Sequence, residues 1–410
     1  MLFNLKILRF QILNILIFTY LLSYILGPAV INIYVTLLSI AGLIFVLMNY
    51  KFLHLLKNDQ SIIILIIFFL YLLLKEFFYQ HQNYEFIVFF RIVIIFIFIS
   101  LYLKINKNIY EININLLFFL LILISLDTFF QFIFGYNILG FENFQSDRLT
   151  SFFQDEPIVG SFLMKIFFPC FVYYYYLNKN TFLVICIIFS FFAVFISGER
   201  MPFLQFLFGL TLFLIFFSKN KIRNSIFLLF FLFFSVFLSF NSPELKNRYF
   251  STFNGFEVLI NDIIDNKAIS KDYDNNGIKD YYLNFASGIE LWKLNKLFGN
   301  GYRFYNNNCS DVLKNQQYFS GCSTHPHNIY IELLSDHGVI GLIIFLIFIF
   351  YLFKNFFTNH KNKKYYGFLI TSVVITVPFV TSQSIFSSFY GSIFFFNFFI
   401  IKIYETKNLY

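Results

Sequence analysis

Long uncharged apolar runs alternate with short polar connections along most of the 410-residue chain. Each run is close to the ~20 residues that an α-helix needs to cross a bilayer. The pattern therefore predicts an all-α polytopic membrane protein with about 12 transmembrane helices. The predicted spans cover residues 10–26, 29–48, 61–78, 86–103, 115–134, 157–177, 181–197, 201–217, 224–240, 327–353, 365–382 and 385–401.

Basic residues indicate which side of the membrane each connection faces, because Lys and Arg in short loops stay in the cytoplasm. With the N-terminus inside, the cytoplasmic segments carry 16 of the 30 Lys and Arg residues, and the short loops of the other face carry only Arg148 and Arg200. Both termini are therefore predicted to be cytoplasmic. Three parts follow: nine helices in 1–240, an extracytoplasmic loop subdomain in 241–326, and three helices with a cytoplasmic tail in 327–410.

Composition changes this picture little. The chain is 59% hydrophobic and 13% charged, whereas a typical soluble chain is about a quarter charged, so an ordinary soluble domain is excluded. The net charge of +8 reflects the basic cytoplasmic loops. No basic segment has the interleaved aromatic residues of a nucleic-acid binder, so we expect no nucleic-acid partner.

The long polar loop between the ninth and tenth spans covers residues 241–324, and its nine basic and nine acidic residues cancel. A structureless loop of this length is usually functional. Apolar spacing predicts one helix over 285–298, lying on the membrane surface or capping the bundle. Cys309 and Cys322 lie in this oxidising compartment, where they form either a disulfide or two free thiols.

A second segment of the loop has the alternating oxygen ligands of a calcium site. Asp272, Asp274, Asn276 and Asp280 are so spaced, and Gly277 stands at the sharp turn. Leu283 stands where a bidentate carboxylate would be needed. A structural calcium ion and a simple Asn-Gly turn therefore both remain open.

Charged residues inside spans are costly and are functional candidates by default. Lys75 and Glu76 lie near the outer end of the third span, where we expect them to reach toward the interface. Arg91 and Lys165 are predicted to approach one outer vestibule. Asp127 is a candidate partner for either, so a buried ion pair and a site for an anion are both open.

Three polar stretches are predicted to converge on the outer face. The first runs from Arg148 to Gly160, the second contains Glu199 and Arg200, and the third, 322–341, contains His325, His327 and Asn328. The two histidines are either zinc ligands or a general base, for which imidazole is suited near pH 7. Neither a third nor a fourth zinc ligand is evident in the spacing.

Together these motifs resemble those of the O-antigen ligase and O-antigen polymerase superfamily of bacterial envelope enzymes. The matching residues are Arg148 with 153–160, Ser197–Arg200, Leu297–Phe304, and above all His325-Pro-His-Asn328 followed by Gly338 and Gly341. Where many of these ligases carry an arginine four residues before the loop tryptophan, this chain has Gly288 before Trp292. Arg303 and Arg248 are the candidate substitutes for that arginine.

The resemblance implies a metal-independent glycosyltransferase of the bacterial inner membrane that requires no cofactor. It would transfer a glycan from an undecaprenyl diphosphate-linked donor to an acceptor glycan or glycolipid on the outer face. His327 would be the general base, with His325 as the alternative. The diphosphate and substrate would be bound by Arg200, Arg148, Arg303, Arg91, Glu199 and Asn328.

Two other classes remain as alternatives: a transporter or flippase of lipid-linked oligosaccharides, and a structural or sensing membrane protein. A flippase would also need many spans and basic residues inside the membrane. The large one-sided loop and the histidine cluster favour the enzyme. A polymerase and a ligase differ in the acceptor. The loop with Cys309 and Cys322, together with the stretch His325–Asn328, slightly favours a polymerase.

Overall fold

The computed structural model describes residues 15–79, 86–105, 113–142, 148–265, 277–314, 321–359, 363–378 and 383–405. Over these ranges the regular elements are all helices, and no strand is formed. Among the described residues, six helices are long and apolar enough to cross a membrane, which confirms an all-helical, multi-pass membrane protein. They are α2 (Pro28–Met48), α3 (Gln60–Tyr79), α4 (Ile87–Ile105), α5 (Ile114–Phe134), α9 (Lys221–Asn241) and α13 (Ile329–Asn359).

The other predicted spans correspond to shorter helices. Residues 15–25 are helical within the predicted first span, and α14 covers only ten of the residues 365–382. A ten-residue helix is about 15 Å long, roughly half the thickness of a bilayer core. Besides residues 15–25, the helices of this group are α6 (Val159–Tyr176), α7 (Asn180–Ile196), α8 (Arg200–Phe216), α14 (Tyr366–Ile375) and α15 (Ser388–Glu405).

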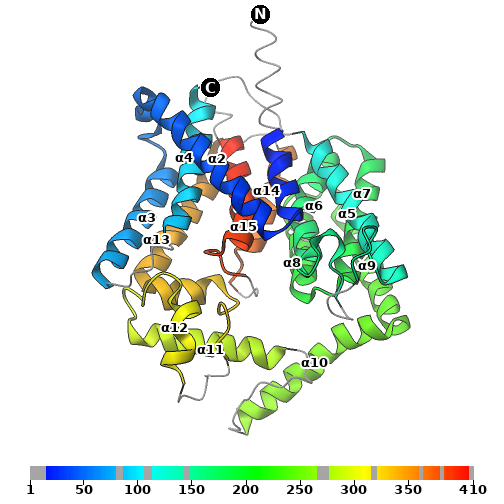
Figure 1. Ribbon diagram of the computed structural model, residues 1–410. Helices are drawn as coiled ribbons and strands as arrows, with labels where there is room; N and C mark the ends of the chain where they lie inside the picture. The colour runs from blue at the N-terminus through cyan, green and yellow to red at the C-terminus, as the bar shows by residue number, and fades with distance from the viewer. Residues whose placement is uncertain are drawn as a thin grey trace, which may run out of the picture. The chain divides into compact units, whose positions relative to one another are not determined.

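The long loop is not structureless. Its described residues form α10 (Pro243–Ile264), α11 (Ile278–Leu294) and α12 (Phe304–Val312). The helix predicted over 285–298 therefore exists, but it begins and ends earlier in the chain. Both α11 and α12 pack against α13, so these two helices cap the bundle (Figure 1).

The described residues form two compact units that interleave along the chain. The first contains residues 15–27, 110–254 and 362–377, with α5 to α9 and α14. Small residues allow its helices to approach closely around Phe168. A Cβ atom at Gly209 would lie 2.2 Å from Phe168 Cζ, and one at Gly367 would lie 2.1 Å from the Phe168 carbonyl oxygen. Glycine is therefore the residue that this packing admits.

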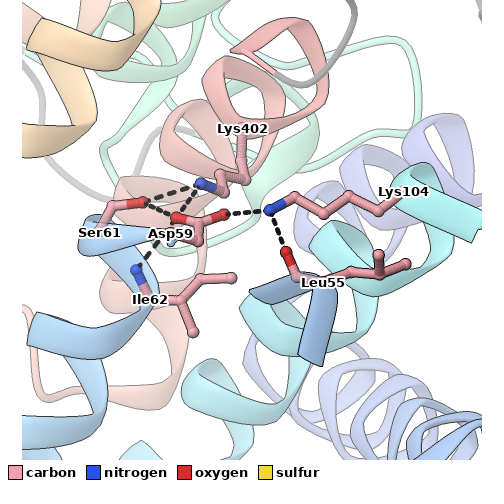
Figure 2. A network of polar contacts seen from close by, with 6 residues as sticks. All are labelled: Leu55, Asp59, Ser61, Ile62, Lys104 and Lys402. Atoms are coloured by element: carbon pink, nitrogen blue, oxygen red, sulfur yellow. Dashed lines mark hydrogen bonds and ion pairs between the residues drawn. The ribbon is translucent and has the colours of Figure 1, made fainter. Parts of the chain in front are cut away.

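The second unit contains residues 28–109, 255–361 and 378–410, with α2, α3, α4, α11, α12, α13 and α15. At its predicted cytoplasmic end lies a cluster of charged side chains, which we call the inner ionic cluster: Asp59, Lys104 and Lys402. Figure 2 shows the Asp59 carboxylate between the two ammonium groups. Lys402 Nζ lies 2.7 Å from Asp59 Oδ1, and Lys104 Nζ lies 3.7 Å from Asp59 Oδ2.

The inner ionic cluster is closed by further hydrogen bonds. Lys402 Nζ donates to Ser61 Oγ at 2.9 Å, and Lys104 Nζ donates to the Leu55 carbonyl at 2.8 Å. Burial alone would raise the pKa of Asp59, but the ammonium groups of Lys402 and Lys104 and the bonds from Lys402 and Ser61 hold it below its ordinary value. Asp59 is therefore ionised at neutral pH and joins the ends of α3, α4 and α15.

Candidate active site

Helix α13 of the second unit is broken at Gly338, which has a left-handed φ of 67°. A break frees backbone groups, and in a membrane these must find partners inside the protein. The loop 296–301 supplies them. Four backbone bonds join the segments: Val339 N to Lys296 O (3.0 Å), Ile340 N to Leu297 O (3.2 Å), Asn300 N to Ser335 O (3.1 Å) and Gly301 N to Asp336 O (2.9 Å).

Two glycines make this docking possible. Gly299 also has a left-handed φ, of 70°, and a Cβ atom there would lie 2.3 Å from the backbone nitrogen of Gly338. A Cβ atom at Gly338 would lie 2.3 Å from the Leu297 carbonyl oxygen. Two motifs that the sequence presents separately, around Gly299 and Gly338, are therefore parts of one structural element.

Helix α3 buttresses this element through Lys75 and Glu76. We predicted that these charges reach toward the interface, which is wrong, because both side chains are buried. Lys75 Nζ donates to the Asp336 carbonyl at the end of the broken turn. Glu76 Oε1 accepts a 2.6 Å bond from the backbone nitrogen of Tyr302. The pair thereby holds the backbone immediately before Arg303.

Arg303 itself adopts a left-handed φ of 54° at the start of α12. A non-glycine residue in this region is strained, and such strain persists where the surroundings impose it, often at functional sites. The next turn is held by Asp336, whose Oδ1 accepts a 2.9 Å bond from the Tyr305 backbone nitrogen. Arg303 therefore lies beside the carboxyl group of Asp336, and both line one cavity.

The second strained residue is His327, also with a φ of 54°. It follows Pro326 in the turn that enters α13. Its ring centroid lies 4.1 Å from that of His325 and 5.4 Å from that of Tyr281. His325 is buried, with Nδ1 2.9 Å from Thr324 Oγ1, whereas His327 is half-buried. The structure thus brings the two predicted histidines together as neighbouring rings.

Asn328 holds the histidine turn in place. Its Oδ1 accepts bonds from the backbone nitrogens of Tyr330 (2.9 Å) and Ile331 (3.1 Å), which caps the start of α13. Its Nδ2 donates to the Pro378 carbonyl at 2.7 Å. Every polar atom of this amide is thus engaged by the protein backbone.

Gly288 lets α11 approach the same turn. A Cβ atom at this position would lie 2.4 Å from Ile331 Cγ2 and 3.1 Å from Pro326 Cβ. An arginine, which many ligases carry here, would have no room in this packing. Glycine at position 288 therefore has a steric reason.

The histidine turn and Arg303 meet at a cavity of about 260 Å³. Four of the residues that line it come from the motifs described above: Arg303, His325, Glu332 and Asp336. Four others come from the segment that leads into α15 and from its first turn, which together we call the start of α15: Gln383, Ser384, Ser387 and Tyr390. The Glu332 carboxylate joins the two sides, because it accepts bonds from Ser384 Oγ and from the backbone nitrogen of Ile385.

The predicted residues of the first unit gather around Glu199. Its carboxylate accepts bonds from the backbone nitrogens of Gly160 (2.6 Å) and Ser161 (3.3 Å) at the start of α6. Burial raises the pKa of Glu199 to about 7, although Arg148, these two amides and Lys165 oppose the shift. Glu199 therefore titrates near neutral pH while it caps a helix.

Arginines flank this carboxyl group. Arg148 Nη2 donates to the Pro157 carbonyl at 2.9 Å, and its buried Nε makes no hydrogen bond to the described residues. Arg200 Nη1 donates to Thr252 Oγ1 at 2.8 Å, and Arg248 Nε donates to the Gly198 carbonyl at 2.9 Å. The start of α10 is thereby attached to the turn between α7 and α8.

Asp127 organises the stretch after Arg148. Its carboxylate accepts bonds from Ser151 Oγ and, at 2.8 Å, from the backbone nitrogen of Ile138. One turn later, Gln131 Oε1 accepts hydrogen bonds from the backbone nitrogens of Thr150 and Ser151. Lys165, one of the two candidate partners of Asp127, forms no ion pair with it among the described residues and donates to Ser161 Oγ.

A family model described as O-antigen ligase matches residues 185–346. The predicted resemblance is confirmed. The matched segment runs from α7 to the apolar part of α13 and contains Glu199, Arg200, Arg303 and both site histidines. The chain is therefore similar to O-antigen ligases over this segment. No curated protein matches the chain.

Arg91 lies outside the segment that matches O-antigen ligases, in α4. Its Nη1 donates to Thr36 Oγ1 at 2.7 Å, and its Nη2 donates to Ser388 Oγ at 3.1 Å. It lines a cavity of only about 20 Å³, which is too small for a diphosphate. In this structure Arg91 therefore joins α2, α4 and α15.

Two other predicted sites lie in the loop. Cys309 and Cys322 form a disulfide, with their Cα atoms 5.6 Å apart. Asp272, Asp274 and Asn276 of the candidate calcium loop lie outside the described residues, and Asp280 is in the first turn of α11. In the described part of the chain, no three His, Cys, Asp or Glu side chains are grouped to hold a metal ion.

The cavity wall formed by the start of α15 was not predicted from the sequence. We interpreted this segment only as an apolar span, and the O-antigen ligase match ends before it. A signal was present, since hydroxyl and amide side chains are dense at its beginning: Gln383, Ser384, Ser387, Ser388, Tyr390 and Ser392. Glu332 and Asp336 were visible in the histidine stretch but carried no predicted role.

Proposed function

We propose that this chain is a glycosyltransferase of cell-envelope polysaccharide biosynthesis, an O-antigen ligase or polymerase of the bacterial inner membrane. It transfers a glycan from an undecaprenyl diphosphate-linked donor to an acceptor sugar on the outer face. One observation carries the proposal: His325, whose ring neighbours that of the strained His327, lines the same cavity as the strained Arg303, in the segment that matches O-antigen ligases.

The reaction needs a base for the acceptor. The acceptor hydroxyl oxygen attacks the anomeric carbon of the donor, and the bond from that carbon to the diphosphate oxygen breaks. The hydroxyl proton passes to the His327 imidazole, and the leaving diphosphate keeps the bonding electron pair. General-base assistance of this kind typically contributes about 10²- to 10⁴-fold. His325, on the cavity wall, is the neighbouring ring and the alternative base.

The leaving group needs positive charge. We assign this task to the guanidinium groups predicted from the sequence, Arg200 and Arg148 first, since guanidinium matches phosphate oxygens bidentately. Arg148 engages the Pro157 carbonyl through Nη2, and its buried Nε makes no hydrogen bond to the described residues. A lipid diphosphate is already a good leaving group, so the proposal includes no metal ion.

Arg200→Lys tests this assignment, because lysine keeps the charge but loses the fork. Release of carrier lipid would be measured in membranes with matched protein levels. We expect release to fall on the order of 10- to 100-fold, within the cost of losing a donor to a developing charge. Arg223→Lys, on the exposed start of α9, is the control. Unchanged release in Arg200→Lys would remove Arg200 from the diphosphate site.

The break in α13 supports a second candidate, a flippase, because discontinuous helices form the substrate sites of many transporters. In those sites, the freed backbone groups face the substrate. Here the amides of Val339 and Ile340 are taken by the loop 296–301. The observation thus favours a fixed scaffold over a transport site, and detection of a new glycosidic bond separates the two functions.

A further inference from the structure

The cavity of about 260 Å³ lies just below the range of roughly 300–1,000 Å³ for pockets that enclose drug-sized ligands. Its size suits one sugar residue rather than an oligosaccharide. The ionisable side chains that line it are the carboxyl groups of Glu332 and Asp336, the imidazole of His325 and the guanidinium of Arg303.

The same carboxyl groups suit hydroxyl donors. Asp336 Oδ1 already accepts bonds from the Tyr305 backbone nitrogen (2.9 Å) and from Ser335 Oγ (3.1 Å). Its orientation is therefore set before any ligand binds, and Oδ2 is left for a further donor. A carboxyl oxygen accepts a hydrogen bond from a sugar hydroxyl in either protonation state of the group.

The wall formed by the start of α15 has neutral hydrogen-bonding groups. The Gln383 side chain is half-buried and makes no hydrogen bond to any residue in the described part of the chain. Its amide therefore offers two donors and one acceptor to a ligand. Ser387 Oγ accepts a 3.0 Å bond from the Tyr390 backbone nitrogen, and its own proton remains for donation.

This wall is rigidly placed. Ser384, next to Gln383, is buried and donates to the Glu332 carboxylate, and the backbone nitrogen of Phe386 donates to Ser384 Oγ at 3.2 Å. The half-buried Tyr390 adds a ring with an apolar body and a polar tip. Carboxylate, amide, hydroxyl and aromatic groups around a small cavity match the alternating hydroxyl and C–H surface of a sugar ring.

From this arrangement we infer that the cavity receives the terminal sugar residue of the acceptor, and that Gln383, Ser387 and Asp336 select which sugar enters. That this sugar belongs to the acceptor rests on the proposed function. The acceptor is assigned here because His325, on the wall of the cavity, lies beside the proposed base, His327. Selection follows because a sugar that lacks a matching hydroxyl leaves one of these polar groups unpaired in the cavity.

The test is direct binding to the full-length protein in lipid nanodiscs. The probes are the methyl glycosides of a hexose, an N-acetylhexosamine and a 6-deoxyhexose, and binding is followed by saturation-transfer NMR. We expect at least one of them to bind the wild-type protein. Gln383→Ala should weaken that binding by about 3- to 10-fold, the usual effect of one lost hydrogen bond. Gln383→Glu, which keeps the shape but loses both N–H donors, should act in the same direction.

Ser392→Ala is the matched control, since Ser392 lies on α15 outside this cavity and donates to the Phe389 carbonyl. It should leave glycoside binding unchanged. The inference is overturned if no glycoside binds the wild-type protein, or if both Gln383 variants bind as the wild type does.

Transfer assays separate this inference from the proposed function. If Gln383→Ala weakens glycoside binding but the wild-type protein forms no glycosidic bond from a lipid-linked donor, the proposed function fails and the sugar site stands. If the bond forms and Gln383→Ala leaves the acceptor KM unchanged, the sugar site fails and the proposed function stands.

Discussion

The second unit buries charged side chains at two places, and the two differ in what surrounds them. The inner ionic cluster of Asp59, Lys104 and Lys402 is closed: each charged group meets another charged group or a polar atom of the protein. The outer group of Arg303, Glu332 and Asp336 instead lines a cavity with His325. Along α3, Asp59 and Lys75 are separated by roughly 24 Å.

The difference teaches that buried charge alone does not mark a functional site. In the inner ionic cluster, charges satisfy one another and join three helices (Figure 2). In the outer group, hydrogen bonds from the protein orient the carboxyl group of Asp336, as the two bonds to its Oδ1 show. The same carboxyl group lines the cavity. Pre-organised groups that face an enclosed space are those that bind or react.

The largest effect that separates the two regions is expected from His327→Ala. Loss of the general base should lower transfer by about 10²- to 10⁴-fold at normal protein levels. His54→Ala is the control, since His54 is exposed on the 3₁₀-helix Tyr50–Leu56. Transfer is measured in membranes with a lipid-linked donor. Activity within a few-fold of wild type would exclude His327 as the base.

In the inner ionic cluster, Lys402→Met should cost stability and leave chemistry intact. Removing one partner of a buried pair leaves Asp59 undercompensated, at a cost on the order of 3 kcal/mol in the free energy of unfolding. Asp59 has a lowered pKa, so this contribution is present at neutral pH and is lost as the pH falls through that lowered value.

Unfolding of Lys402→Met would be measured in nanodiscs at pH 7, together with transfer per folded molecule. Transfer per folded molecule should stay within about twofold of wild type, because general-base chemistry at the other end of α3 is untouched. A large loss of transfer with unchanged stability would contradict the structural role of this cluster.

Glu199 in the first unit gives a pH test. Its pKa is raised from 4.5 to about 7, so the folded protein binds the proton more tightly than the unfolded chain does. This favours folding below pH 4.5, and the advantage fades as the pH rises through 7. Relative to Glu199→Gln, the wild-type protein should lose on the order of 3 kcal/mol of stability over that interval. A pH-independent difference would contradict the raised pKa.

The smallest expected effect on transfer is that of removing Lys75, which contacts the broken helix α13. Lys75→Met removes one charge-assisted bond to the Asp336 carbonyl, and transfer should fall by about 5- to 10-fold. Lys51→Met, on an exposed residue, serves as the control. If the two variants have equal transfer rates, Lys75 does not position Arg303.

Hydrophobic periodicity was sufficient to predict an all-helical membrane protein, and short motifs were sufficient to predict the similarity to O-antigen ligases. It was insufficient for Lys75 and Glu76, whose burial depends on a loop more than 200 residues away that docks into α13. It was also insufficient for Asp59, which no local feature distinguishes from a loop carboxylate until α15 brings Lys402 against it. The histidine turn was predictable because its residues are adjacent in sequence. Its partners from α15 were not.

The most direct test of the central claim is reconstitution of the wild-type protein alone in vesicles with a lipid-linked glycan donor and an acceptor glycolipid. The account predicts a new glycosidic bond, release of the carrier diphosphate in equal amount, and loss of both in His327→Ala. Movement of intact donor across the bilayer with no bond formed would contradict the account and favour the flippase.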